Sequence, residues 1–307
     1  MSETKRFFIF GAGYSGKAFA RSRPEAGVEL FGTTRSAENF EDLRQAGIKP
    51  LHFDGQTVSP ELRAAIEEST HLVVSIAPDE SGDPVLNADA DAEILRGLKR
   101  LQWIGYLSTV GVYGDHGGAW VDEPSECRPV SRRSKFRVAA EQAWSDFGRD
   151  SGLAVAILRL SGIYGPGRNA FVNLAAGTAR RLVKPGQVFN RIHVDDIAGA
   201  LWHLAGARTG GIFNVTDDRP APPQDVVAYA AGVMGVDAPP EIPFETAELT
   251  PMARSFYGEN KRVSNALIRQ TGYAFRHPDY VSALDAMWAD GSWRGAGASD
   301  ARSPMRR

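Results

Sequence analysis

Short, almost uninterrupted runs of apolar residues recur along the chain. The first run, Phe7-Phe8-Ile9-Phe10, shows no alternation with polar positions. Strands that are covered on both faces need this pattern, because side chains on both sides are buried. Comparable runs predict six more strands, at 28–36, 48–54, 71–76, 103–108, 154–160 and 211–215.

The segments between these runs carry apolar residues at helical spacing. Asp195 is predicted to be the N-cap of one helix, and a proline-rich stretch introduces another near 224–234. Strands that alternate with helices predict an α/β fold with a doubly wound parallel sheet. A further helix over 134–148 is expected to bury one face made of Phe136, Ala140, Ala143, Trp144 and Phe147.

The alternation becomes irregular after Gly165. Glycine and basic residues are frequent over 166–192, and prolines interrupt the chain repeatedly between 239 and 251. We therefore predict a core domain over 5–165 and a smaller lobe over 166–290, which also contributes the last strand and helix of the sheet. The segment 291–307 has little to bury and is predicted to be a disordered tail.

The first strand runs directly into a G-x-G-x-x-G turn, and a segment suited to a helix follows. Glycines let the backbone turn tightly and approach a pyrophosphate, while the helix N-terminus offers N–H groups to the anion. This arrangement predicts a dinucleotide site. A purely structural turn is the alternative. The predicted cofactor residues here are Gly11, Gly13, Tyr14, Ser15 and Gly16.

The end of the second strand bears on which dinucleotide binds. An acidic residue there would bond the ribose hydroxyls of NAD, whereas a basic one accommodates the 2′-phosphate of NADP. Thr34, Arg35 and Ser36 offer a guanidinium and two hydroxyls, which suits a phosphate. NADP is therefore predicted over NAD, with a solvated surface charge as the alternative for Arg35. Asp54 and Ala77, after the third and fourth strands, are also assigned to the cofactor.

Composition narrows the class of protein. The 307 residues are 43% apolar and 23% charged, as in ordinary globular proteins, and the net charge of −2 gives no reason to expect nucleic acid or an anionic membrane as partner. The single cysteine, Cys127, excludes an internal disulfide framework and fits a reducing cytoplasm. No run approaches the roughly 18 apolar residues of a membrane span, and the first six residues are too polar for a signal peptide.

Three further motifs follow the glycine turn in a recognisable order, at 107–114, 160–167 and 191–196. Together the four motifs resemble those of the extended short-chain dehydrogenase/reductases, the NAD-dependent epimerase/dehydratase family. The resemblance covers about residues 5–285. It implies a Rossmann sheet of seven strands ordered 3-2-1-4-5-6-7, a C-terminal substrate lobe, and NAD(P)-dependent oxidoreductase or epimerase chemistry.

The resemblance also implies two catalytic positions. In the family a Ser or Thr four residues before a Tyr orients the substrate, and here these residues are Thr109 and Tyr113. The alternative is that Thr109 only forms hydrogen bonds with backbone groups at the strand end. The family's Tyr-x-x-x-Lys pair, whose tyrosine transfers the proton, precedes an Ala-Ala-Glu helix. Aligned on Ala139-Ala140-Glu141, the pair becomes Arg133 and Arg137.

A second alignment of this pair, on Ser134-Lys135, yields Ser131 and Lys135, so neither register supplies the tyrosine. A guanidinium with a pKa above ~12 cannot exchange protons near neutrality. We therefore expect the proton relay to be absent or rebuilt. Arg137 or Lys135 is expected to grip the cofactor ribose or a substrate phosphate. Tyr113 and Tyr164 are the substitute proton donors considered, against a packing role for both.

The remaining candidates concern the substrate. In atypical members of the family an Asp replaces an active-site Asn, and Asp91 is the first candidate, with Asp89 close behind. The histidines show no metal-ligand spacing, so no metal is predicted. The substrate residues predicted as anion clamps or pocket walls, against a structural or surface role, are Arg168, Arg191, His193 and Arg262.

Three functions remain open at this point. The first is an NADP-dependent oxidoreductase or epimerase acting on a small carbonyl or sugar-like substrate. The second is a catalytically silent NADP-binding sensor, and the third is a structural subunit that binds nothing. The expected partner is a small molecule, with no nucleic acid and no membrane. A homodimer is an open alternative, and the expected location is cytoplasmic.

Overall fold

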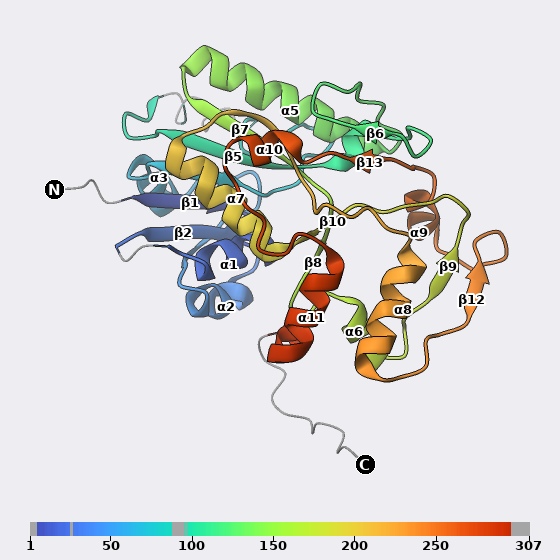
Figure 1. The fold of residues 1–307 in the computed structure, drawn as a ribbon. Coiled ribbons are helices and arrows are strands. Elements are labelled where there is room, and N and C mark those ends of the chain that lie inside the picture. Colours follow the sequence, from blue (N-terminus) through green and yellow to red (C-terminus); the bar gives the residue numbers. More distant parts are fainter. Residues whose placement is uncertain (1–4, 25–26, 88–94, 96, 296–307) are drawn as a thin grey trace.

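Seven parallel strands form the central sheet of the computed structural model (Figure 1), which describes residues 5–24, 27–87, 95 and 97–295. Their order is β3-β2-β1-β4-β5-β7-β11, as the resemblance implied. The strands are β1 (Arg6–Phe10), β2 (Glu29–Thr34), β3 (Lys49–His52), β4 (His71–Val74), β5 (Trp103–Thr109), β7 (Ala154–Leu160) and β11 (Gly211–Val215).

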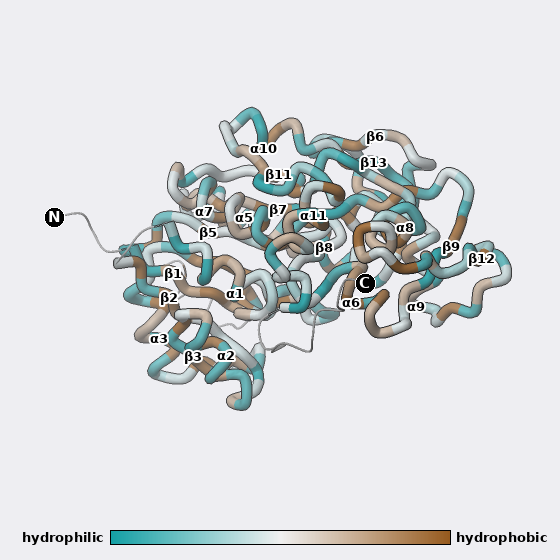
Figure 2. The backbone as a smooth tube through the Cα atoms, turned by 60° about the horizontal axis from the view of Figure 1, so that its bottom comes forward, coloured by the Kyte–Doolittle hydropathy of each residue, from teal (hydrophilic) through white to brown (hydrophobic). Residues whose placement is uncertain are grey.

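Both faces of the sheet are buried, which explains the continuous apolar runs. Phe7 and Ile9 pack into the core on one face, and Phe8 and Phe10 into the core on the other, since successive side chains of a strand point in opposite directions. Figure 2 colours hydrophobic residues brown, and brown segments occur along the strands and helices of this interior. The first core includes α1 (Tyr14–Arg21), α2 (Phe40–Gln45), α7 (Val194–Ala207) and α10 (Ala266–Gln270); the second includes α3 (Pro60–Glu67) and α5 (Arg132–Ser151).

A smaller lobe lies beside the sheet, with α6, α8 and α11 grouped together (Figure 1). Its core contains Phe171, Tyr280, Met287 and Trp293. Three two-stranded parallel pairs, which the sequence did not predict, are β8–β10, β9–β12 and β6–β13. The elements are β6 (Trp120–Val121), β8 (Gly162–Tyr164), α6 (Ala170–Ala175), β9 (Arg181–Val183), β10 (Arg191–His193), α8 (Pro223–Met234), β12 (Glu241–Pro243), α9 (Pro251–Phe256), β13 (Arg262–Val263) and α11 (Tyr280–Asp290), with 3-10 helices η1 (Ala37–Asn39), η2 (Val110–Tyr113) and η3 (Ser292–Arg294).

Three details differ from the sequence predictions. In α5, Ala143 is exposed although its apolar neighbours Ala140 and Trp144 are buried. The N-cap of α7 is His193 rather than Asp195, because the His193 ring accepts the Asp195 N–H. Trp293 is buried in the lobe, although it belongs to the segment predicted as a disordered tail. Residues 296–307 of that segment lie outside the described residues.

The strands position the candidate site by ending together. The carboxyl ends of β1, β2, β4, β5 and β7 lie at one edge, because these strands are parallel neighbours. In such sheets ligands bind at this edge. None of the described helices is long and apolar enough to cross a lipid bilayer.

Candidate functional site

The glycine turn after β1 leaves room for a ligand at one position. Gly11 has φ of 80°, and a Cβ there would lie 3.0 Å from Ile76 Cγ1, so this position requires glycine. A Cβ on Gly13 would meet no described atom within 4 Å. Gly13 is the N-cap of α1, whose first N–H groups have no partner within the helix. Open space in front of these donors fits a pyrophosphate.

At the end of β2, a cation is available for a ligand. The Arg35 side chain is exposed and has no hydrogen bond or ion pair within the described part of the chain. The Ser36 hydroxyl accepts the Glu38 N–H at 3.3 Å, and the Thr34 hydroxyl accepts a proton from Asn39 Nδ2 at 3.3 Å. Because both hydroxyls act as acceptors here, their own protons are left to donate.

The other two predicted cofactor residues lie at the same edge, after β3 and β4. Asp54 is exposed and accepts the N–H groups of Gln56 and Thr57, each at 2.9 Å. These bonds lower the pKa of the Asp54 carboxyl. Ala77 is exposed and directly follows Ser75 and Ile76, which lie next to Gly11. The structure thus leaves both side chains open to solvent.

Arg168 was predicted for the substrate, but it lies beside the cofactor turn. Gly165 and Arg168 exchange backbone hydrogen bonds of 3.0 and 2.9 Å in a tight turn. Tyr14, in the first turn of α1, donates its hydroxyl proton to the Pro166 carbonyl at 3.0 Å. Burial raises the pKa of Tyr14 to about 12, against the lowering effect of the nearby Arg168 guanidinium. Arg168 is exposed, so its charge can face a ligand at α1.

The start of α5 carries the residues of both predicted registers of the Tyr-x-x-x-Lys pair. Arg137 donates from Nη1 to the Tyr106 hydroxyl at 2.9 Å and to the Leu107 carbonyl at 2.7 Å. Arg133 and Lys135 are exposed. Arg137 therefore reaches the carboxyl end of β5, where the register on the Ala-Ala-Glu helix places it.

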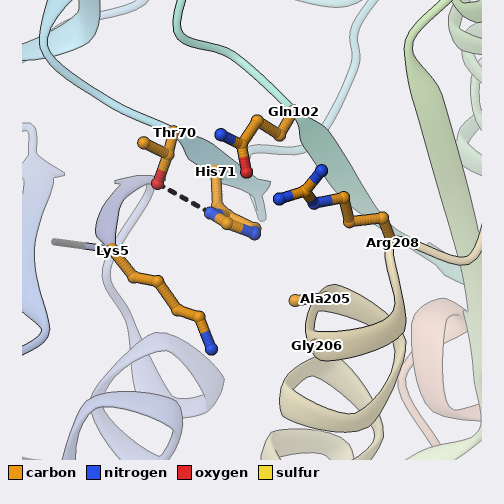
Figure 3. Close-up of a pocket in the computed structure, with 7 residues that line it drawn as sticks. All are labelled: Lys5, Thr70, His71, Gln102, Ala205, Gly206 and Arg208. Carbon is orange, nitrogen blue, oxygen red and sulfur yellow. Dashed lines mark hydrogen bonds between the residues drawn. The ribbon is translucent and has the colours of Figure 1, made fainter. Parts of the chain in front are cut away.

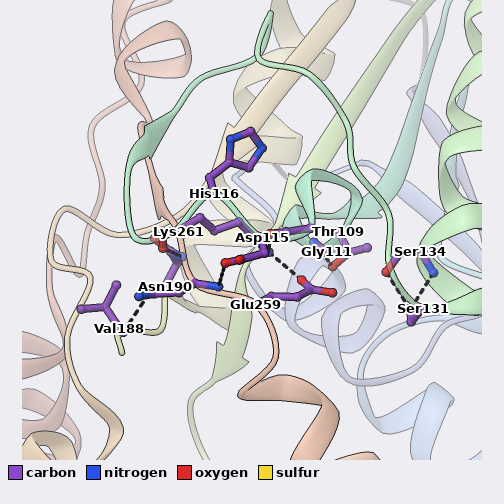
Figure 4. Close-up of polar contacts among 12 residues, drawn as sticks. Thr109, Gly111, Asp115, His116, Ser131, Ser134, Val188, Asn190, Glu259 and Lys261 are labelled. Carbon is purple, nitrogen blue, oxygen red and sulfur yellow. Dashed lines mark hydrogen bonds and ion pairs between the residues drawn. The ribbon is translucent and has the colours of Figure 1, made fainter. Parts of the chain in front are cut away.

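Thr109 and Tyr113 both have structural partners. Thr109 Oγ1 accepts the Gly111 N–H at 3.1 Å and so caps η2, close to Ser134 of α5 (Figure 4). The buried Tyr113 hydroxyl donates to Asn214 Oδ1 at 2.8 Å and accepts from Arg159 Nη1 at 2.9 Å. Burial raises its pKa to about 12. Tyr113 is thus held in the interior, where its hydroxyl proton is already donated to Asn214.

A buried ion pair, which the sequence analysis missed, holds this region together. Arg159 of β7 and Glu141 of α5 are paired at 2.8 Å, and both side chains are at most 6% exposed. The Ser108 hydroxyl donates to Glu141 Oε1 at 2.5 Å. One signal was present in the sequence: Arg159 is the one charged residue in an otherwise apolar strand, where an isolated charge would be costly.

Tyr164, His193 and Arg191 likewise face protein rather than a cleft. The Tyr164 hydroxyl is buried without a partner among the described residues, and burial raises its pKa. Its ring packs edge-on against His193 at 5.4 Å. Arg191 donates to the carbonyls of Phe189 at 2.9 Å and Ala221 at 3.0 Å. Arg191 is thus engaged with backbone carbonyls, whereas the Tyr164 hydroxyl and His193 Nε2 are buried without a hydrogen-bond partner among the described residues.

The segment that contains Arg262 also has a structural role. Arg262 donates to the Gly118 carbonyl, and the buried Lys261 donates to the Gly114 carbonyl at 2.7 Å. Lys261 is also paired with Glu259 at 2.7 Å (Figure 4). These hydrogen bonds join the segment of Lys261 and Arg262 to the loop after η2. The predicted anion clamps Arg191 and Arg262 are therefore engaged with backbone carbonyls instead.

Comparison with known proteins identifies the family. The sequence model of the "NAD dependent epimerase/dehydratase family" matches residues 8–216. The chain belongs to this family. A functionally unknown conserved protein from Silicibacter pomeroyi is 44% identical, with 94% of this chain and 100% of that chain covered and a TM-score of 0.86. Protein YeeZ of Escherichia coli strain K12 is 27% identical over 286 residues, which cover 90% of this chain and 97% of that protein.

A more distant likeness concerns the fold alone. The crystal structure of a human epimerase family protein with NADPH is 17% identical, covers 93% of this chain and 99% of that chain, and has a TM-score of 0.71. Membership of the epimerase/dehydratase family makes a nicotinamide dinucleotide the class of cofactor, and the glycine turn has the shape that such a cofactor needs. Asp91 and Asp89, predicted for the substrate side, lie outside the described residues.

Two residues of the fourth motif, 191–196, lie next to a histidine that is distant in the sequence. Ligand atoms of His193, Asp195 and His277 lie within 4.8 Å of one another, although the two histidines are far apart in sequence. The rings of His193 and His277 are 4.0 Å apart. His193 Nδ1 accepts the Asp195 N–H at 3.2 Å, so this nitrogen already serves the helix cap. Burial lowers the pKa of His193 to about 4, and the His277 charge adds to the effect.

Proposed function

We propose that this chain is a cytoplasmic NADP-dependent oxidoreductase or epimerase-like enzyme that acts on a small carbonyl or sugar-like substrate. The observation that carries the proposal is the glycine turn with open space at Gly13, together with the guanidinium of Arg35 at the end of β2, which has no partner among the described residues. The one cysteine, Cys127, is free, which suits a reducing compartment.

Several residues have the chemistry to hold NADP at this edge. The backbone at Gly11 and Gly13 and the first turn of α1 would hold the pyrophosphate. Arg35, with the hydroxyls of Thr34 and Ser36, would bind the 2′-phosphate. We also assign Arg168 to the cofactor, since its turn is bonded to the first turn of α1. When bound, a nicotinamide cofactor supplies or accepts a hydride.

The substrate would meet Thr109 and Arg137 at the end of β5. The Thr109 oxygen accepts the Gly111 N–H, which leaves the hydroxyl proton to donate to a substrate carbonyl or hydroxyl oxygen. Arg137 occupies the place of the family's lysine and would hold the ribose, but it does not exchange a proton near neutral pH. Thr109 thus orients the substrate, and we assign the proton itself to solvent water.

A catalytically silent NADP-binding sensor is the second candidate. The burial of two tyrosines favours it, because the Tyr113 hydroxyl makes two hydrogen bonds in the interior and the Tyr164 hydroxyl is buried. A panel of carbonyl compounds and nucleotide sugars, incubated with protein and NADPH, separates the two candidates. Turnover followed at the nicotinamide absorbance band would exclude the sensor. Tight cofactor binding without turnover would favour it.

The cofactor assignment has a direct test in Arg35. We expect NADPH to bind roughly ten- to a hundredfold more tightly than NADH, as charge-assisted hydrogen bonds of ~1.5–3 kcal/mol would give. Arg35→Ala should remove this preference and leave NADH affinity nearly unchanged, because the pyrophosphate site is separate. Exposed Arg149, on α5, provides the matched control Arg149→Ala. Calorimetry with both cofactors decides: equal affinities in the unmodified protein would refute NADP specificity.

A further inference from the structure

Two buried histidines at the start of α7 and before α11 are placed differently from a histidine with a structural partner. In Figure 3 the ring of His71, at the start of β4, is held by the Thr70 hydroxyl, 2.8 Å from its Nδ1. The rings of His193 and His277 instead lie against each other, with centroids 4.0 Å apart. Ligand atoms of both, and of Asp195, lie within 4.8 Å of one another. Two imidazoles and a carboxylate are a ligand set for divalent transition metals.

The Asp195 carboxylate is close to both rings without bonding to either. Its Oδ2 atom is 3.8 Å from His193 Nδ1 and 3.9 Å from His277 Nε2, which is too long for a hydrogen bond. Ligand atoms at about 2.0–2.2 Å from one tetrahedral metal ion are about 3.4 Å apart. Small movements of these side chains would therefore bring the three atoms onto one ion. The Asp195 side chain is 35% exposed, so it can move and can leave a position open to water.

The nitrogen that His193 turns toward Asp195 is in the form that a metal needs. His193 Nδ1 accepts the Asp195 N–H at 3.2 Å, so a neutral ring carries its proton on Nε2. Nε2 lies beside Gly165, where a Cβ would be 3.3 Å from it. An unprotonated nitrogen and a carboxylate oxygen thus lie near each other as two acceptors, which favours a cation between them. The ion would replace the long N–H bond as the partner of Nδ1.

A buried carboxylate holds His277 in this position. Asp196, which follows Asp195 in α7, accepts the backbone N–H groups of Arg276 and His277 at 2.6 and 2.9 Å. The Tyr273 hydroxyl donates to the same carboxylate at 3.0 Å. These bonds fix the segment before α11 against the start of α7. The ligands from both segments are therefore held together before a metal ion arrives, as the outer partners of metal ligands do.

One cation of the chain competes for Asp195, but weakly. Arg276 Nη1 lies 3.8 Å from Oδ2, and the Arg276 side chain is 77% exposed, so this pair contributes little. We propose that His193, Asp195 and His277 bind a divalent transition metal ion such as Zn²⁺, with water in the remaining position. The ion would join the start of α7, which packs on the sheet, to the segment before α11 of the smaller lobe.

Titration of the untagged full chain with Co²⁺, after removal of metals with a chelator, tests this proposal. Co²⁺ is the probe because its visible absorption reports the coordination, whereas Zn²⁺ has a filled d shell and is silent. We expect one equivalent to give the spectrum of a four- or five-coordinate site, and Zn²⁺ to displace it. Zn²⁺ should also raise the thermal midpoint of unfolding, since it binds the folded chain. A spectrum of hydrated Co²⁺ alone would overturn the proposal. No NADPH is added, so the outcome is independent of the cofactor assignment.

Variants of the ligands locate the bound ion. His277→Phe keeps a ring and Asp195→Asn keeps the shape of the side chain, and each removes one ligand. Each should weaken Zn²⁺ at least ~100-fold in calorimetry, because even the loss of an outer partner costs roughly 10–100-fold. The control His52→Asn, at an exposed histidine, should leave the affinity unchanged. Undiminished binding in both ligand variants, or loss in the control, would overturn the proposal. A thiolate charge-transfer band in the Co²⁺ spectrum would identify Cys127 as a ligand and also overturn it.

Discussion

Two regions at the carboxyl edge of the sheet differ in how their polar groups are used. At the glycine turn and the end of β2, Gly13 faces open space and Arg35 has no partner within the described residues. At the end of β5 and the start of α5, Tyr113, Arg137 and Glu141 are all bonded to other parts of the protein. The hydrogen-bond donors of the first region are open to a ligand, whereas most polar groups of the second region bond to other parts of the protein.

This difference is what the proposed function would require, in which a cofactor site lies beside an altered proton relay. The Tyr113 hydroxyl donates one hydrogen bond and accepts another in the interior, so it does not reach a substrate. An exposed guanidinium at a strand end has no such constraint. Substitutions in the β5–α5 region should therefore change stability, and substitutions in the glycine-turn region should change cofactor affinity.

The largest expected effect is on stability. Glu141→Ala leaves the Arg159 guanidinium buried without its carboxylate, and we expect the free energy of unfolding to fall by ~3–5 kcal/mol. Glu126→Ala, which breaks an exposed pair with Arg128, should cost less than ~1 kcal/mol. Urea unfolding measures both. A stable Glu141→Ala protein with weakened NADPH binding would reverse the assignment of the two regions.

Next in size is the effect of a methyl group at the glycine turn. Gly13→Ala should leave the fold intact, because a Cβ there meets no described atom within 4 Å, but it should weaken NADPH roughly 100-fold by blocking the pyrophosphate. Gly11→Ala should also reduce thermal stability, since φ there is 80°. If calorimetry finds full NADPH affinity in Gly13→Ala, the turn is purely structural.

A third expectation concerns pH and His193. Burial lowers the pKa of His193 to about 4, below the ~6.5 of an unfolded histidine, so the unfolded chain takes up the proton first. The contribution of His193 to stability is therefore present above pH ~6.5 and is lost as pH falls toward about 4, by up to ~1.4 kcal/mol per pH unit.

His193→Asn tests this expectation, because asparagine is a good N-cap without a titrating ring. The difference in unfolding free energy between this variant and the unmodified protein should shift in favour of the variant between pH 7 and 5. The exposed His52 provides the control His52→Asn, which should show no such shift. If the unfolding free energies of the unmodified protein and His193→Asn change in parallel with pH, the buried ring is not the source of the pH dependence.

The smallest effect is expected for a conservative change at Arg137. Arg137→Lys should keep most of the cofactor affinity, because a cation remains near the Leu107 carbonyl, while Arg137→Ala should weaken the cofactor about tenfold. Neither variant should alter a limb of the pH profile of any turnover, since arginine does not titrate there. A lost acidic or basic limb would show that proton transfer depends on this position.

The sequence by itself determined the framework. The apolar runs predicted all seven strands, since a strand buried on both faces has no place for polar side chains. The glycine turn and Arg35 were visible because their properties are local: backbone freedom at Gly11, and a charge that directly follows β2. The strand order, by contrast, came from the resemblance of the motifs to the epimerase/dehydratase family, which the family match supports.

Only the tertiary structure decided which polar side chains remain available. Arg191 and Arg262 looked like anion clamps, but distant carbonyls at Ala221 and Gly118 take up their donors. Glu141 finds Arg159 through the packing of α5 on β7, and no local pattern encodes that pairing. Hydrogen-bond partners far apart in sequence are set by how helices and strands pack. For this reason charge and spacing alone predicted the glycine turn as a cofactor site, but they did not predict the partners of the candidate catalytic residues.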